Sequence, residues 1–418
     1  MLVLFCLGFL LGAKHERSIE LAPFSTNKSQ ELDVRGVWLT TLYGLDWPSI
    51  SSLDAKNDVL RIRLQKKELV AKLDNLVRLG INTVFFQVKP DGNVLYHSAI
   101  LPWSEVLTGI AGQDPGYDPL EFILEEAHKR GLKIHAWLNP YRVTLNTHLK
   151  TSLRLHVMLG VSPASVFSLH PDWIRIARSH YVLDPGLPDV RNWITNIVRE
   201  LINNYQVDGI QFDDYFYDES KNSQLDDDAT YHQYGQGFTE KADWRRSNTL
   251  CMVQQVYHVI KSLNANIKFG ISPNGIWRNI ADDPRGSATE GGGAAYDTAY
   301  ADIRQWVKNG LIDYVAPQLY WPVKHKKVRY DVLAKWWSEV VRDTDTQLYI
   351  GIALYKIGNP TKSEPDWGLE NGVLELRREL DFNDKLPEIS GTILFREAYL
   401  TQPQTATAVD YLKYRWNP

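Results

Sequence analysis

Two adjacent carboxylates, Asp213 and Asp214, are the residues of this chain best suited to acid–base chemistry. They end an apolar run that begins at Val207, and three aromatic residues follow them directly. A strand that buries its apolar side chains gains nothing in packing by ending in two acids. An acid pair beside flat rings suits proton transfer to a sugar that is held by stacking.

The alternation of side chains along a strand distinguishes the two acids. Gln211, Asp213 and Tyr215 share one face of the run, and Asp214 lies on the other face with the apolar residues. We therefore expect Asp213 to point into a site as general acid or base, with Asp214 at the point where the strand gives way to a loop. The alternative is structural: each acid caps the following loop by accepting backbone hydrogen bonds.

A second catalytic acid is needed by glycosidases of the two-carboxylate type. Its distance from the first is about 5–5.5 Å for retention and about 6.5–9.5 Å for inversion. The run from Leu348 to Lys356 offers no carboxylate, whereas the last apolar run is followed by Glu397. Glu397 is therefore the expected partner, as base or electrostatic stabiliser, and its structural alternative is an ion pair with a neighbouring arginine.

Polar and aromatic residues also gather where other apolar runs end. Rings that stack on sugar faces, and amides and cations that bind hydroxyl groups, form the mixture that a carbohydrate site needs. The structural alternative for each of these residues is packing or turn formation at the rim of the fold. The expected substrate-binding residues are Trp38, Gln87, Lys89, Asp91, Trp137, Asn139, Tyr141, Arg142, Gln211, Tyr215, Asn274, Trp277, Arg278, Gln318, Tyr320 and Trp321, and Thr40 lies beside the first of them.

The elements that must position these residues alternate between short apolar runs and longer stretches of helical periodicity. The predicted strands are residues 34–41, 81–89, 132–139, 207–213, 268–273, 312–320, 348–355 and 389–395. The predicted helices are residues 64–79, 119–130, 189–205, 244–263, 300–309, 330–341, 373–380 and 405–415, with a further helix in the loop after Arg142. Eight such units predict an α/β fold, a (β/α)8 TIM barrel with long loops at the C-terminal face.

The N-terminal region differs from the rest of the chain. Residues 1–13 are apolar and too short to cross a bilayer, as in a secretory signal that is truncated at its start. Residues 14–32 form a polar linker, and residues 33–418 form the barrel domain. We expect an exported protein of the periplasm or outer membrane, attached to a membrane only through its N-terminus. Lipid attachment at Cys6 is doubtful because Leu4 and Phe5 precede it in place of small residues.

Composition and motifs exclude several function classes. The net charge of -4 and the absence of a basic run argue against nucleic-acid binding. Two cysteines allow neither a disulfide framework nor a thiolate metal site, and the acidic run Asp226–Asp228 lacks the spacing of calcium ligands. No phosphate loop, dinucleotide fingerprint or zinc-protease motif is present. We therefore expect neither a metal nor an organic cofactor. We also expect the protein to be a monomer.

Four segments resemble the glycosyl-hydrolase-like-10 family, and the likeness extends from about residue 33 to the C-terminus. These segments are Arg35–Leu39, Asn82–Gly92, His135–Arg142 and Asp208–Tyr217. The resemblance implies a (β/α)8 hydrolase that cuts β-1,4 bonds in the glycan strands of peptidoglycan, with a preference for strands that lack stem peptides. It also implies attachment to the outer membrane as a lipoprotein.

A second, weaker likeness concerns the mechanism. The run from Asp208 is similar to the Asp-Gly-x-Asp-x-Asp-x-Glu signature of chitinase-like barrels, but Gln211 replaces one Asp and Tyr215 replaces the catalytic Glu. The work of that Glu would then fall to Asp213 or Asp214. Gln318 and Tyr320 resemble the polar pair that holds an N-acetyl group in such sites, which implies cleavage assisted by the substrate's own acetamido oxygen.

Two other functions remain open at the level of sequence. Because Glu is missing at Tyr215, the barrel mouth could belong to a pseudoenzyme that binds glycan at the septal cell wall without cutting it. An amylase-like enzyme acting on storage glycans is the other alternative, and the expected export signal argues against it.

Overall fold

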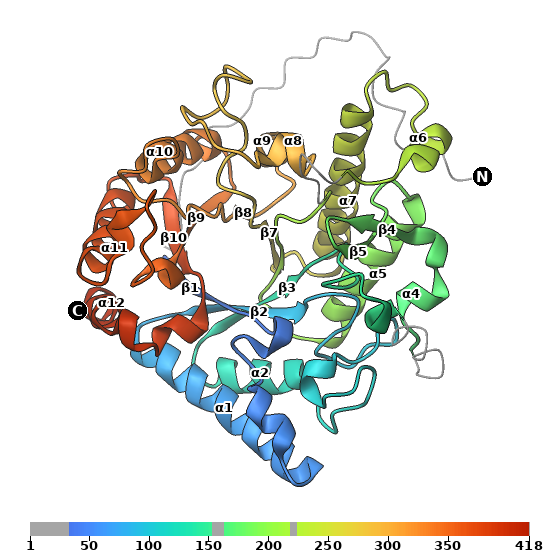
Figure 1. Ribbon diagram of the computed structural model, residues 1–418, viewed down its shortest axis with the longest axis horizontal. Coiled ribbons are helices and arrows are strands. Elements are labelled where there is room, and N and C mark those ends of the chain that lie inside the picture. The colour runs from blue at the N-terminus through green and yellow to red at the C-terminus, as the bar shows by residue number, and fades with distance from the viewer. Residues whose placement is uncertain (1–32, 153–162, 218–223, 418) are drawn as a thin grey trace, which may run out of the picture. The chain divides into compact units, whose positions relative to one another are not determined.

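The computed structural model describes residues 33–152, 163–217 and 224–417, and within these ranges eight parallel strands close into a barrel. Around the barrel the strand order is β1-β10-β9-β8-β7-β6-β3-β2 (Figure 1). The barrel strands are β1 (Val34–Leu39), β2 (Thr83–Lys89), β3 (Lys133–Leu138), β6 (Gly209–Phe212), β7 (Lys268–Ile271), β8 (Tyr314–Val315), β9 (Gln347–Ile352) and β10 (Ile389–Leu394). The predicted (β/α)8 TIM barrel is therefore confirmed.

Helices form the outer ring of the barrel (Figure 1). Those that follow barrel strands are α1 (Asp58–Arg78), α2 (Pro119–His128), α5 (Pro188–Asn204), α7 (Lys241–Leu263), α9 (Ile303–Lys308), α10 (Tyr330–Val341), α11 (Leu369–Asn383) and α12 (Ala406–Trp416). Short helices α4 (Val166–Leu169), α6 (Asp228–Tyr234) and α8 (Ala295–Thr298) lie in the loops. Most boundaries agree with the predicted ones within a few residues. α1 begins earlier than predicted because the Asn57 side chain caps it by accepting the Leu60 N–H at 2.9 Å.

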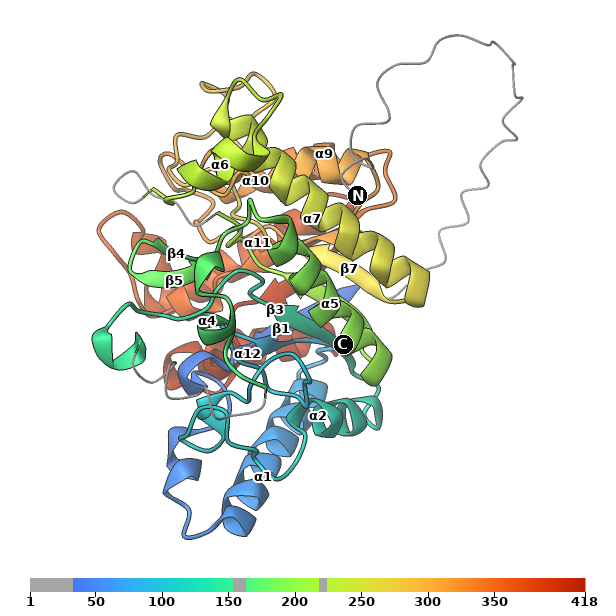
Figure 2. The same ribbon diagram turned by 90° about the vertical axis from the view of Figure 1, so that its right-hand side faces the viewer.

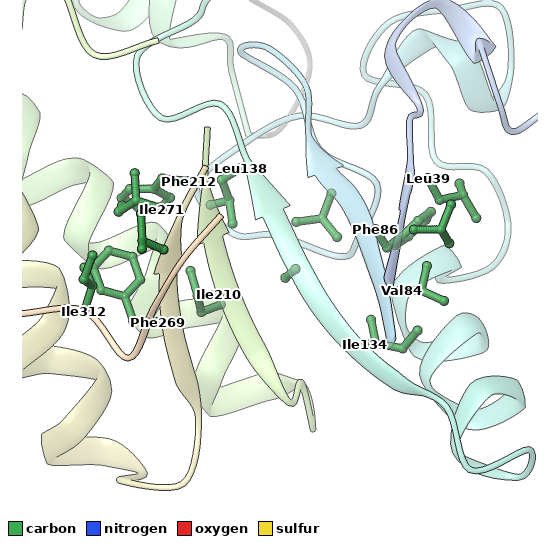
Figure 3. Packing of buried hydrophobic residues seen from close by; sticks show 14 of the residues in the cluster. Leu39, Val84, Phe86, Ile134, Leu138, Ile210, Phe212, Phe269, Ile271 and Ile312 are labelled. Carbon is green, nitrogen blue, oxygen red and sulfur yellow. The ribbon is translucent and has the colours of Figure 1, made fainter. Parts of the chain in front are cut away.

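The strands bury both of their faces, which explains their nearly continuous apolar sequences. Residues such as Val84, Phe86 and Ile210 point outward and pack under the helices (Figure 3). Trp38, Phe85, Trp137, Tyr314, Ala316, Tyr349 and Ile393 form a separate cluster. Strand glycines make room for such rings: a Cβ on Gly270 would lie 2.1 Å from the Tyr314 ring.

Two parts of the barrel differ from the prediction. The observed β8 has two residues, because Pro317 lacks the N–H that a longer ladder requires, although its carbonyl still accepts the Gly351 N–H at 2.9 Å. The loop after β3 also holds an antiparallel hairpin of β4 (Ile174–Ala177) and β5 (His180–Leu183), which the sequence did not predict. Its turn places Arg178 at φ +52°, where Asn or Gly would be the usual signal.

The hairpin has a function within the fold. It stands out on the left of the barrel in Figure 2. The Leu183 N–H donates to the Tyr141 carbonyl at 2.8 Å, and the Val143 N–H donates to the Tyr181 carbonyl at 3.0 Å. These bonds fix the segment after β3 that carries Arg142.

The expected signal segment and linker, residues 1–13 and 14–32, lie outside the described residues. Within the described ranges no helix combines the length and apolarity that crossing a membrane requires.

Candidate active site

The acid pair follows β6, and both of its members line the same cavity, with Asp213 on the inward side as expected from the strand alternation. Ile210 and Phe212 pack outward under the helices (Figure 3). Gln211 and Asp213 both line a cavity of about 180 Å³ at the barrel mouth. Asp214 also lines this cavity but is half-buried, whereas the Asp213 residue is only 4% exposed.

A chain of side-chain amides holds the Asp213 carboxylate. The Asn139 side-chain amide donates to Asp213 Oδ2, and Asn139 Oδ1 in turn accepts from Gln87 Nε2 at 2.8 Å. Gln87 Oε1 accepts the Thr41 N–H at 2.9 Å from the loop after β1. The Tyr215 N–H lies 3.4 Å from Asp213 Oδ1. Three neighbouring barrel strands and their loops therefore fix one carboxyl group.

Burial changes the acidity of this carboxyl group. The pKa of Asp213 is raised to about 7, mainly because enclosure disfavours the charged form. The Arg142 guanidinium opposes this rise, and the negative charge of Asp214 adds to it. Arg142 is itself placed over the Tyr215 ring, 4.6 Å from the ring centroid. A carboxyl group with a pKa near 7 is suited to general acid–base work at neutral pH.

Asp214 is held from the other side of β6, by a residue that follows β8. Gln318 Nε2 donates to Asp214 Oδ1 at 3.2 Å and to the Ser272 carbonyl at 3.0 Å. Asp213 and Asp214 are the acidic members of the cavity lining among the described residues.

Aromatic and polar side chains from seven barrel strands or their loops complete the cavity lining. The predicted residues that line it are Trp38, Gln87, Trp137, Asn139, Arg142, Gln211, Asp213, Asp214, Tyr215, Gln318 and Tyr320. Thr40, Leu42, Leu45, Ser272 and Phe395 also line it. Of these, Ser272 and Phe395 were detectable as inward residues near the ends of predicted strands, whereas Leu42 and Leu45 carry no signal in the sequence.

Several polar atoms of this lining are buried without a hydrogen-bond partner among the described residues. They are both side-chain heteroatoms of Gln211 and the hydroxyl of Thr40. Buried polar groups are nearly always hydrogen-bonded, and an unsatisfied one costs about 1–3 kcal/mol. Their position in the cavity wall makes them available to a polar ligand or to water.

A second cavity of about 230 Å³ adjoins the first. Asp214 and Tyr215 line both cavities, and Asn274 lines the second. Each cavity is smaller than the usual ligand pocket of about 300–1,000 Å³, whereas the two together fall within that range.

Glu397 is not brought to the cavity, which corrects its expected position opposite Asp213. It begins a short 3-10 helix, Glu397–Leu400, after β10 and is 1% exposed. Its Oε2 pairs with Lys72 Nζ on α1, and burial raises the pKa of its carboxyl group. The last strand ends with Phe395 facing the cavity, so Glu397 turns toward the outer helices. The ion-pair alternative therefore describes its environment, with lysine in place of arginine.

Lys89 and Asp91 are also corrected, because neither lines a cavity described above. Lys89 Nζ donates to the carbonyls of Asp91 and Asn139, each at 2.8 Å, and of Pro140 at 3.3 Å. Burial lowers the pKa of Lys89 to about 7 and raises that of Asp91 to about 6. The lysine ties the loop after β2 to the loop after β3.

Four further predicted residues lie away from both cavities. Tyr141 is in the core, and Trp277 is buried with its indole N–H donating to Asp302 at 3.0 Å. Arg278 pairs with Asp297, and Trp321 packs against the core. These three aromatic residues and one arginine follow strands closely in sequence, but the loops turn their side chains toward the helices.

Metal binding finds no support in the described ranges, where no group of three His, Cys, Asp or Glu residues could hold a metal ion.

Comparison with known proteins agrees with this architecture. The model of the family described as Glycosyl hydrolase-like 10 matches residues 33–369. The chain is 56% identical over 394 residues to Glycosyl hydrolase DigH of Escherichia coli (strain K12), covering 94% of this chain and 90% of that protein. It is 41% identical to Glycosyl hydrolase YngK of Bacillus subtilis (strain 168), covering 89% of this chain and 70% of that protein.

Solved structures resemble the fold at low identity. The PgaB (BpsB) glycoside hydrolase domain of Bordetella bronchiseptica has a TM-score of 0.54 at 14% identity, covering 91% of this chain and 99% of that chain. An endo-1,4-beta-mannanase of Rhizomucor miehei has a TM-score of 0.51 at 9% identity, covering 92% of this chain and 95% of that chain. On the family match and the identity to its relatives, the chain belongs to the glycosyl hydrolase-like 10 family and is a glycosidase.

Proposed function

We propose that this glycosidase cleaves β-1,4 bonds in the glycan strands of peptidoglycan, and that it acts on strands without stem peptides. The observation that carries the proposal is the enclosed Asp213 carboxyl group, with a pKa of about 7, beside buried polar groups that have no partner. The rings of the lining suit sugar faces, and its amides suit hydroxyl and acetamido groups. The family resemblance of the motif segments supports the choice of polymer.

The proposed mechanism uses Asp213 first as acid and then as base. Its carboxyl group donates a proton to the bridging oxygen while the bond from that oxygen to C1 breaks. The acetamido carbonyl oxygen of the sugar that contains this C1 atom attacks C1 and forms an oxazolinium ion. Asp214, held by Gln318, accepts the acetamido N–H and stabilises the positive charge. Water then attacks C1 while the bond from C1 to the acetamido oxygen breaks, and it gives its proton to the Asp213 carboxylate, which restores the acid.

The substitution Asp213→Asn tests the assignment of the acid. We expect release of new reducing ends from peptide-free strands to fall about 10²–10⁴-fold, the usual contribution of a general acid or base. Asp208→Asn is the matched control, because Asp208 lies before the same strand and accepts the Ile134 N–H at 2.7 Å, outside the two cavities. Circular dichroism of both variants should match that of the wild type.

Three results would contradict parts of the proposal. Full activity of Asp213→Asn would remove Asp213 from the mechanism. If strands whose acetamido groups have been converted to free amines were cleaved as fast as unmodified strands, the substrate oxygen would be excluded as nucleophile. Binding of strands by the wild type without any new reducing end would favour the glycan-binding pseudoenzyme.

We also propose that the protein acts outside the cytoplasm as a monomer, with membrane attachment only through its N-terminus. The apolar residues 1–13 support export, although they lie outside the described residues. Cell fractionation of the full chain tests its location, and light scattering of the purified protein tests its oligomeric state.

A further inference from the structure

The second cavity lies directly beside the acid pair, yet the proposed chemistry uses only the first. Asp214 and Tyr215 form the boundary, because both residues line both cavities. A general acid must reach the bridging oxygen between two sugars. If one sugar occupies the first cavity, the bridging oxygen lies at this boundary and the next sugar enters the second cavity.

The far wall of the second cavity consists of small side chains. Ala295, Thr298 and Ala299 of α8 and its C-terminal end line it, together with Ala301. Small residues in this wall leave space that longer side chains would fill.

Two rings that the protein holds in place form another part of the wall. Phe216 packs edge-on against Trp306 with the ring centroids 5.4 Å apart. Tyr217 Oη accepts from Asn248 Nδ2 at 3.1 Å, and the Tyr217 N–H donates to the Ala299 carbonyl at 3.4 Å. Both rings are almost fully buried. The wall is therefore formed before any ligand arrives, which reduces the entropic cost of binding.

We propose that the second cavity binds the N-acetylated sugar on the leaving-group side of the scissile bond. The first cavity then holds the sugar that is attacked. The scissile bond then lies between two bound sugars, one on each side of the acid pair. This inference rests on the proposed function and adds the direction in which the strand lies across the site.

A graded filling of the second cavity tests this proposal. Thr298 is half-buried in its wall, and Thr298→Leu and Thr298→Trp place increasing volume there. The two substrates are peptide-free glycan strands and the β-fluoride of a short N-acetylated oligosaccharide. The fluoride leaves as a single atom and needs no sugar in the second cavity. We expect strand cleavage to fall at least about tenfold more than fluoride release, with the larger effect for Trp.

Gly292→Trp is the matched control for an added ring. Gly292 lies in the loop before α8 and does not line the second cavity, and a Cβ added at this position would meet no atom within 4 Å.

Two outcomes would overturn the assignment of the second cavity while leaving the proposed function in place. One is equal loss of strand cleavage and fluoride release in the Thr298 variants, and the other is no loss of either. A wild type that turns over neither substrate would contradict the proposed function itself, and this inference with it.

Discussion

At the scale of single residues, two neighbouring carboxylates acquire different chemistry from their positions on one strand. Asp213 follows the inward face of β6 and is enclosed, so its pKa rises to about 7. Asp214 is half-buried and receives a hydrogen bond from Gln318. The difference arises from the depth of each side chain in the barrel mouth, because Asp213 is almost fully buried whereas Asp214 lies half-buried at the boundary of the two cavities.

The pH dependence of activity should report the Asp213 carboxyl group. Since the acid form donates the proton, kcat/KM should fall as the pH rises through about 7. Arg142 lowers this pKa, so Arg142→Gln should move the alkaline limb to higher pH. The measurement is the pH profile of kcat/KM on peptide-free strands. An alkaline limb that stays in place in Arg142→Gln would show that Asp213 does not set it.

At the scale of elements, the loop after β3 depends on a buried lysine from β2. Lys89 donates to main-chain carbonyls of both loops, including that of Asn139, whose side chain binds Asp213. Lys89→Met keeps a similar length but cannot donate hydrogen bonds. We expect kcat to fall about tenfold or more and KM to change less, because a small displacement of a positioned group is costly to catalysis.

The pH profile distinguishes this positioning role from a general loss of stability. Displacement of Asn139 and Arg142 should shift the alkaline limb of Lys89→Met, whereas partial unfolding would lower the active fraction without shifting the limb. A variant with unchanged kcat and an unchanged limb would show that Lys89 does not position the site.

Glu397 provides the opposite case, a predicted catalytic acid that the structure assigns to packing between elements. Glu397→Gln should keep kcat within about twofold of the wild type. Because the variant loses a largely buried ion pair with Lys72, we expect the free energy of unfolding to fall by about 1–3 kcal/mol. Denaturant unfolding and initial rates measure the two effects. A hundredfold loss of kcat in a folded variant would restore Glu397 to the mechanism.

The contrast between Asp213 and Glu397 shows how far the sequence could predict the site. Strand periodicity determines which face a residue occupies within a strand, and it correctly placed Asp213 and most of the predicted lining. Glu397 lies three residues beyond the end of β10, where the turn of the loop decides its direction. The same limit applies to Trp277, which follows β7 but packs in the core.

The hairpin of β4 and β5 could not be predicted for a related reason. Its turn has Arg178 at a positive φ and no Asn-Gly or Asp-Gly pair, so the usual local signal is absent. Its position is determined by bonds to distant residues, such as the one from Leu183 to Tyr141. Element order and fold class were predictable because eight repeated units specify them redundantly.

At the scale of the whole molecule, the closed barrel relies on glycines that allow large rings to fill its interior. A Cβ at Gly270 would lie 2.1 Å from the Tyr314 ring. Gly270→Ala should therefore lower the free energy of unfolding by about 1–3 kcal/mol through overpacking. Gly292→Ala is the control, because its Cβ would meet no neighbouring atom. Equal unfolding midpoints for the two variants would contradict this account of the interior.

The rings inside the barrel also determine how a polymer can approach the enzyme. The centre of the barrel is filled by the rings of Trp38, Phe85, Tyr314 and Tyr349. A glycan chain therefore cannot pass through the barrel, and substrate and products must enter and leave by the same open face. A polymer lying across two adjoining cavities need not be threaded from a free end. An enzyme built in this way can engage a chain whose two ends are both attached elsewhere.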